Sequence, residues 1–171
     1  MNTTEAIRAR RSIRKYKPGA AIPQEHIDLM LEAAMCAPSA MNMRPWTFIV
    51  LENRELKATL AGKHPYARFL RDASLAVVVC GDPKAYPKPP GKELWTQDCA
   101  AATQNILLQA TELGYGSCWS AVYPDDDRCA LFTEALDIRD AVPFCVIGIG
   151  VADEHPERRG FYDKTKVRYI R

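Results

Sequence analysis

The sequence lacks the cysteine and histidine spacing of a zinc site. None of the six cysteines stands in a Cys-x-x-Cys pair, and the three histidines are scattered along the chain. Most of the cysteines lie in apolar stretches, which is typical of buried, reduced thiols in a cytoplasmic protein. We therefore predict neither a metal site nor a disulfide framework.

Glycine-rich phosphate-binding loops are missing as well. The chain contains neither Gly-x-Gly-x-x-Gly nor Gly-x-x-x-x-Gly-Lys, which excludes a Rossmann or a Walker loop. The net charge is only +2, whereas a domain devoted to nucleic acid is normally more basic. No apolar stretch follows the N-terminal cations, and polar residues interrupt the longest helical pattern, so we expect no signal peptide and no membrane span. Side chains would have to hold any phosphate ligand.

The stretches that remain have the composition of one folded domain covering residues 1–171. With 47% hydrophobic and 26% charged residues, the chain resembles neither a disordered nor a membrane protein. Helical and strand-like patterns interleave without a linker, which predicts a central sheet flanked by helices in an α+β or α/β domain. The expected helices cover 4–9, 24–37, 53–60 and 95–113, with another after 125–127, and the expected strands cover 46–51, 74–80, 117–123 and 144–151.

Three details of these elements carry expectations. Thr3 or Thr4 is expected to cap the first helix. The acidic run 125–127 suits the first turn of a helix better than a metal site. The helix over 95–113 is apolar nearly all round, so we expect it to be buried on several sides. A monomer of this size would struggle to cover it, which favours a homodimer.

A basic segment follows the first helix. Arg10-Arg11-Ser12-Ile13-Arg14-Lys15 places four cations and one hydroxyl in six residues. Guanidinium groups suit phosphate because they offer paired donors that stay charged. The alternative is a solvated charged face or a nonspecific nucleic-acid patch. Lys166 and Arg168, near the other end of the chain, are a second source of cations, unless that end is only a frayed terminus.

A second segment, Ala37-Pro38-Ser39-Ala40-Met41-Asn42-Met43-Arg44-Pro45-Trp46, complements the first. Together with Arg-Arg-Ser-x-Arg upstream, its Pro-Ser-x-x-Asn-x-x-Pro-Trp pattern resembles the flavin-dependent nitroreductase family. The resemblance continues through Gly116-Ser117-Cys118-Trp119 to the basic tail. It implies an α+β fold with a mostly antiparallel sheet, and an FMN-binding homodimer that takes electrons from NAD(P)H.

The resemblance also implies roles for individual residues. Arg10 and Ser12 would hold the phosphate and ribityl groups of FMN, and Arg14 would face the pyrimidine edge of the flavin. The turn 38–42 would pack beside the flavin of the neighbouring subunit, and the strand through Ala121 would pass over the ring. The candidate cofactor-binding residues are Arg10, Arg11, Ser12, Arg14, Pro38, Ser39, Ala40, Asn42, Arg44, Ser120, Ala121, Lys166 and Arg168.

Two of the remaining features qualify this assignment. Arg44 stands where the family commonly has Gln, so it either changes the charge of the pocket or forms a surface ion pair. The proline-rich segment 82–91 reads as a surface loop that we expect near the pocket. No nucleophile with a neighbouring base is legible, and Cys118 reads as a core thiol, so we assign no catalytic side chain.

The resulting hypothesis is an FMN-dependent oxidoreductase that passes electrons from NAD(P)H to nitroaromatic, quinone or related small-molecule acceptors. It needs no metal, nucleic acid or membrane. Two alternatives stay open: a flavin-destroying or dehalogenating relative on the same fold, and a non-redox module that binds a nucleotide or nucleic acid.

Overall fold

A single antiparallel sheet forms the centre of the molecule. The computed structural model describes residues 1–87, 93–157 and 159–171, so residues 88–91 of the expected loop lie outside the described part. The strands are β1 (Trp46–Leu51), β2 (Leu75–Gly81), β3 (Gly116–Ala121) and β4 (Val142–Gly150), and their order is β1-β2-β4-β3. All three pairings are antiparallel, which confirms the expected sheet.

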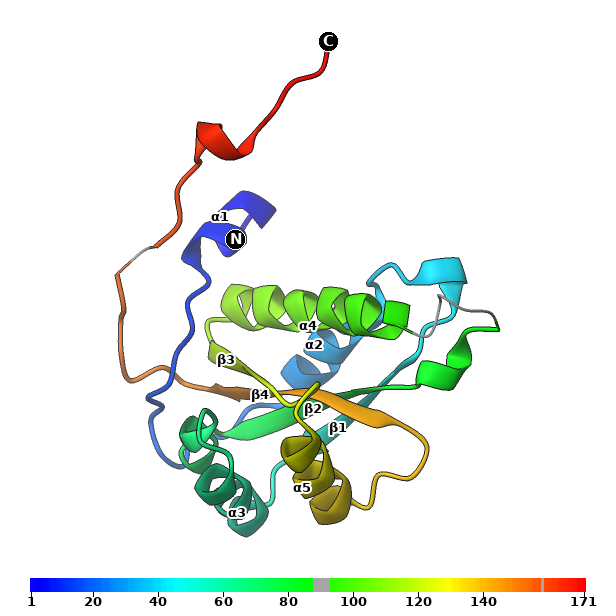
Figure 1. The fold of residues 1–171 in the computed structure, drawn as a ribbon. Helices are drawn as coiled ribbons and strands as arrows, with labels where there is room; N and C mark the ends of the chain where they lie inside the picture. Colours follow the sequence, from blue (N-terminus) through cyan, green and yellow to red (C-terminus); the bar gives the residue numbers. More distant parts are fainter. Residues whose placement is uncertain (88–92, 158) are drawn as a thin grey trace.

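Helices cover both faces of this sheet (Figure 1). The helices α2 (Gln24–Met35) and α4 (Leu94–Glu112) lie on one face, and α3 (Arg54–Lys63) and α5 (Asp126–Leu136) lie on the other. The strand β2 is buried along its whole length because it lies in the interior of the sheet, between β1 and β4, and both of its faces are covered. Its uninterrupted apolar run is the pattern expected for such a strand.

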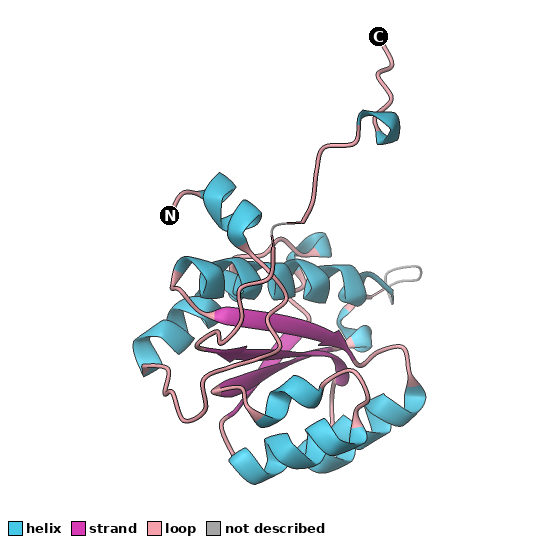
Figure 2. Cartoon of the chain, turned by 90° about the vertical axis from the view of Figure 1, so that its left-hand side faces the viewer, coloured by secondary structure: helices cyan, strands magenta, loops and turns pink. Residues whose placement is uncertain are grey.

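The helix α4 is more completely covered within one chain than its sequence suggested. Of its residues, only Gln97 and Glu112 are exposed. The sheet lies beneath it, while α2 and the short helix α1 (Thr3–Ala9) lie against it (Figure 2). The prediction of burial on several sides is therefore confirmed, but this helix gives no reason to expect a second subunit.

The ends of two helices are fixed by side-chain caps. Asn2, and not Thr3 or Thr4, caps α1: its side chain accepts from the Glu5 amide while the Glu5 carboxylate accepts from the Asn2 amide. This reciprocal pair satisfies two helix-end donors at once. Asp125 caps α5 by accepting from the Arg128 amide, and the acids after it occupy the first helical turn as expected.

Both termini extend away from the sheet and run beside one another where they leave it. The segment after α1 lies along β3, where the Ile13 amide donates to the Ser117 carbonyl at 2.9 Å. The C-terminal arm, residues 153–157 and 159–171 of the described chain, leaves the body and projects past α1 (Figures 1 and 2). None of the helices in the described ranges is long and apolar enough to cross a membrane.

Candidate functional site

The basic segment and β3 enclose a hollow of about 410 Å³. Arg10 and Ser12 line it from one side, and Ala121 lines it from the strand. Arg10 lies directly after α1, and its amide donates to Ala6 at 3.0 Å, so the helix end fixes the start of its side chain. No carboxylate in the described part of the chain pairs with the Arg10 guanidinium. The structure thus brings together three of the residues predicted from the sequence.

The alternation of side chains along β3 decides which of its residues face this hollow. Ser117, Trp119 and Ala121 lie on the face toward α4, where they line the hollow together with Gln104 and Leu107 of that helix. Ser120 lies on the opposite face, buried, with its hydroxyl 3.5 Å from Nε2 of His64. The sequence analysis missed Ser117 and Trp119, although counting back in twos from Ala121 would have found them.

Ser117 carries a buried hydroxyl without a partner. Its side chain is only 2% exposed, and its Oγ has no hydrogen-bond partner among the described residues. A buried polar atom left unpaired is costly, so an unpartnered hydroxyl on the wall of a hollow indicates a missing ligand or water. This atom lies beside Ser12, because the two serines form a bridge between their backbones.

A second hollow has a volume of about 480 Å³. Arg14 lines it together with Tyr66, Arg68 and Asp72. The Arg14 guanidinium donates to the carbonyl of Ser12, which lines the first hollow, at 3.5 Å. Each of the two hollows thus has an arginine on its wall, Arg10 in the first and Arg14 in the second. Tyr66 and Arg68 were not among the candidate residues, and their sequence context carries no motif that would have marked them.

The second arginine of the basic segment faces elsewhere. Arg11 lines a separate hollow near the root of the C-terminal arm and donates to the carbonyl of Arg159 at 3.3 Å. Its Nε is buried without a partner among the described residues. Alternation along an extended segment explains this, because Arg10 and Ser12 share one side while Arg11 and Ile13 share the other. Arg11 was predicted to bind the cofactor together with Arg10, but the two side chains line different hollows.

The turn 39–44 has an unusual backbone. Met41, Asn42 and Arg44 have φ values of 53°, 58° and 49°, in the left-handed region that residues with a Cβ seldom occupy. Such a conformation costs about 1–3 kcal/mol per residue and persists only where the surroundings impose it. The turn is held by the Ser39 hydroxyl, which accepts from the Arg44 amide at 3.0 Å, and by Asp98, whose carboxylate accepts from the Ala40 amide. Strain of this kind is typical of functional segments.

Arg44 folds back onto its own turn. Its Nε donates to the Asn42 side chain at 3.0 Å, and no ion pair to it is found among the described residues. The surface ion pair that was the alternative for Arg44 is therefore not what the structure shows. Both side chains are exposed, so the guanidinium is available to a neighbouring molecule.

The hollow of about 410 Å³ that Arg10 lines is called the Arg10 hollow below. Within one chain, some of the candidate residues lie away from it. None of the residues lining that hollow comes from the turn 38–44 or from the C-terminal arm. The end of the arm, drawn in red, projects beyond α1 (Figure 1), and it holds Lys166, in the short 3-10 helix Lys164–Lys166, and Arg168. The proline-rich segment approaches the turn instead, since the Asp82 amide donates to the Pro45 carbonyl at 2.9 Å.

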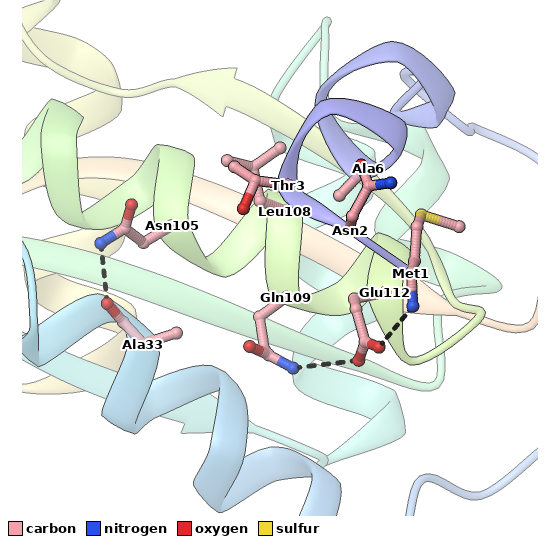
Figure 3. A pocket seen from close by; sticks show the side chains of 9 residues that line it. All are labelled: Met1, Asn2, Thr3, Ala6, Ala33, Asn105, Leu108, Gln109 and Glu112. Carbon is pink, nitrogen blue, oxygen red and sulfur yellow. Dashed lines mark hydrogen bonds and ion pairs between the residues drawn. The ribbon is translucent and has the colours of Figure 1, made fainter.

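A smaller hollow of about 220 Å³ lies between α1 and α4, and none of the candidate residues lines it (Figure 3). Two of the polar groups on its wall already bond to protein atoms. The Met1 ammonium lies 3.3 Å from Glu112, and the Asn105 amide donates to Ala33 at 2.8 Å. We therefore assign it no ligand.

Burial favours the neutral form of two titratable groups near the site, Cys118 and His64. The Cys118 thiol is buried, which confirms the predicted core position, and burial raises its pKa. Burial lowers the pKa of His64, whose Nε2 lies 3.1 Å from the Ala121 carbonyl while its Nδ1 accepts from the Tyr66 amide. All six cysteines are free, and no cluster that could hold a metal is found in the described ranges.

Comparison with known proteins identifies the family of this chain. The model of the Nitroreductase family matches residues 7–64 and 60–151. A protein of Methanothermobacter thermautotrophicus, provisionally named NADH dehydrogenase/NAD(P)H nitroreductase, is 44% identical over 168 residues, which cover 98% of this chain and 86% of the relative.

Solved structures resemble the whole fold. A crystal structure from Parabacteroides distasonis with the same provisional name has a TM-score of 0.91 at 36% identity and covers 99% of this chain and 98% of its own. An FMN-dependent nitroreductase of Clostridium difficile has a TM-score of 0.88 at 32% identity, with coverage of 98% and 99%. These matches span nearly the whole chain, and the chain belongs to the nitroreductase family.

Proposed function

We propose that the chain is an FMN-dependent oxidoreductase that takes electrons from NAD(P)H and passes them to a nitroaromatic, a quinone or a related small molecule. The observation that carries the proposal is the hollow that Arg10, Ser12, Ser117 and Ala121 line together. The Arg14 side chain contacts the Ser12 carbonyl at its edge. Residues 1–171 act as one flavin-binding domain in this proposal. The six free cysteines support a cytoplasmic location.

The residues that line the first hollow fit FMN. The guanidinium of Arg10, which pairs with no carboxylate of the described residues, suits the phosphate, because phosphate takes two parallel donors. The orphaned hydroxyl of Ser117 and the hydroxyl of Ser12 suit the polar ribityl chain between phosphate and ring. Ala121 is small enough to let backbone approach a flat ring. A cofactor with an anionic end and an aromatic end would use each of these groups.

When bound, FMN supplies the transfer of electrons between NAD(P)H and the acceptor. The protein's own part is to hold the cofactor and to set the charge around it. Arg14, whose side chain contacts the Ser12 carbonyl, would supply a fixed cation that stabilises negative charge on a reduced ring. Cys118 and His64 stay neutral, so we assign neither of them a proton to transfer.

The proposed working unit is a homodimer in which each site takes residues from both subunits. The turn 38–44 and the cations Lys166 and Arg168 do not reach the Arg10 hollow of their own chain. The C-terminal arm exposes large apolar side chains, which are normally covered by a partner. They are Phe161, Tyr162, Tyr169 and Ile170, with exposed fractions of 88%, 66%, 72% and 85%.

The function is tested by the purified protein itself. It should be yellow and release FMN on denaturation, and the bound flavin should lose its visible absorbance when NADH or NADPH is added without oxygen. A panel of nitroaromatics and quinones should then restore the absorbance. A colourless protein that cannot be reconstituted with FMN would overturn the proposal, and retained FMN that neither nucleotide reduces would reject NAD(P)H as the donor.

Sharing of the site is tested by complementation. One variant carries Arg10→Ala, the other carries Asn42→Ala with Ser39→Ala, and the two are unfolded and refolded together. In a mixed dimer one site has both defects, whereas the other has none and should regain FMN and activity. If mixed dimers form and nothing is regained, each site belongs to one chain.

A further inference from the structure

The carboxylate of Asp98 lies buried beneath the turn 39–44 and contacts it directly. Asp98 stands in the first part of α4 and is only 6% exposed. Both of its oxygens lie 3.1 Å from the Ala40 amide, which donates to them. In the described ranges no cation pairs with this carboxylate. A buried charge without a counter-ion is costly, so its hydrogen bonds must compensate for that cost.

The second hydrogen bond to Asp98 comes from the proline-rich segment. The hydroxyl of Tyr86, itself buried, donates to the carboxylate. Burial and this bond raise the pKa of Tyr86 above its usual value, so the phenol keeps its proton and remains a donor. The segment is also attached to the far end of the turn by the bond from Asp82 to Pro45. Asp98 thus accepts from both the turn, through the Ala40 amide, and the proline-rich segment, through the Tyr86 hydroxyl.

Within the described ranges, the remaining polar contacts of the turn are internal to it. The Asn42 and Met43 amides donate to the carbonyls of Ser39 and Ala40, and the Arg44 contacts also end within residues 39–44. Internal bonds alone do not fix how the turn is placed on the protein. The bond from Ala40 to Asp98 does so, because α4 is rigidly packed between the sheet and α2.

We propose that Asp98 is a positioning residue that holds the left-handed turn 39–44 in the orientation in which it meets the flavin. The inference rests on the proposed function for its consequence, but the contact that carries it belongs to the chain alone. Asp98 lines neither the Arg10 hollow nor the hollow that Arg14 lines, and its hydrogen bonds go to Ala40 and Tyr86. It acts through Ala40, and it makes the geometry of the turn depend on the segment that carries Tyr86.

The first test measures hydrogen exchange at the turn in the absence of flavin. In the flavin-free protein, the Ala40 amide should exchange with solvent at least about tenfold faster in Asp98→Ala than in the wild type, because it loses a charge-assisted bond. Asp98→Asn keeps the shape and should show a smaller change in the same direction. Thr103→Val is the matched control. It also removes a buried polar group from α4, one that donates to Cys99 at 2.7 Å and does not contact the turn.

The second test reads flavin binding. Asp98→Ala should raise the dissociation constant for FMN roughly tenfold, while Thr103→Val should leave it near the wild-type value at a comparable loss of thermal stability. Adding Met41→Gly to Asp98→Ala should recover part of the affinity, because glycine adopts a positive φ without strain. A merely structural defect would not be rescued by a second change at an exposed residue.

The outcomes separate this inference from the proposed function. If the wild type binds no FMN, the proposed function fails, and the exchange of Ala40 still decides whether Asp98 holds the turn. If the wild type binds FMN and both Asp98 variants retain wild-type affinity and wild-type exchange at Ala40, the positioning role is wrong. Equal loss of FMN affinity in Thr103→Val and Asp98→Ala would also overturn it.

Discussion

Replacing Arg10 by Ala should weaken FMN binding with little effect on folding. The guanidinium has no carboxylate partner in the described part of the chain, so its removal breaks no ion pair there. The backbone bond from Arg10 to Ala6 is untouched by the substitution. A hydrogen bond to a charged group contributes about 1.5–3 kcal/mol, which corresponds to a rise of roughly ten- to a hundredfold in the dissociation constant. Changes at such positions usually alter the free energy of unfolding by less than about 0.5 kcal/mol.

The assay compares FMN with riboflavin, which has the same ring but no phosphate. Titrations followed by flavin fluorescence should show that Arg10→Ala loses affinity for FMN and not for riboflavin. The loss should be smaller at high salt, because screening already weakens the attraction in the wild type. Lys15→Ala is the matched control, since it removes one exposed cation from the same segment.

Two results would refute the reasoning. Unchanged FMN affinity in Arg10→Ala would place the phosphate elsewhere, whereas an equal loss for FMN and riboflavin would show that Arg10 shapes the hollow without binding phosphate. Equal losses in Arg10→Ala and Lys15→Ala would reduce the effect to general electrostatic attraction.

Three further predictions concern pH, packing and the arm. Burial lowers the pKa of His64, so the unfolded state binds a proton more readily, and the free energy of unfolding should fall as pH drops below about 6.5. In chemical denaturation His64→Gln should weaken this pH dependence, and an unchanged dependence would assign it to other groups. Gly116→Ala places a Cβ 2.8 Å from Ile13, so it should lower the free energy of unfolding by roughly 1–3 kcal/mol and also weaken FMN binding. The control is Gly62→Ala, whose new Cβ would meet nothing within 4 Å. Removing residues 161–171 should yield a monomer in sedimentation with weak FMN binding, and a dimer of unchanged affinity would contradict the role given to the arm.

Elements with marked boundaries were predictable from the sequence. The strand β1 was placed to the residue, because Pro45 precedes it and the polar pair Glu52-Asn53 follows its aromatic and β-branched run. The buried run of β2 and the long apolar pattern of α4 were found within one or two residues. In these segments local propensity and tertiary burial favour the same structure.

Where neighbouring residues compete, the sequence was less decisive. Asn2, Thr3 and Thr4 are all good cap residues, and only the three-residue spacing from Asn2 to Glu5 selects the observed pair. Alternation along β3 predicts which side chains share a face. The resemblance instead singled out the consecutive residues Ser120 and Ala121, whose side chains point to opposite faces. Ser120 and Ala121 therefore separated in the structure.

Contacts between distant segments could not be predicted. Nothing in the local sequence places Ser12 beside Ser117, or Asp98 under the turn 39–44. Such contacts depend on which elements pack together, and a single sequence contains that information only in the sum of many weak preferences. The family resemblance supplied residues for the site, whereas the structure supplied the neighbours that hold them.

The basic segment is connected to the C-terminal arm as closely as to the hollow. The Lys17 amide donates to Val151, the Asp153 amide donates to Lys15, and the Glu154 carboxylate accepts from the amides of Arg14 and Lys15. The backbone that carries Arg10, Ser12 and Arg14 is thus held between β3 on one side and the root of the arm on the other. If the arm orders on a partner subunit, its root is fixed, and the basic segment is fixed with it. Dimer formation and FMN binding would then each favour the other, because linkage requires that the coupling be reciprocal.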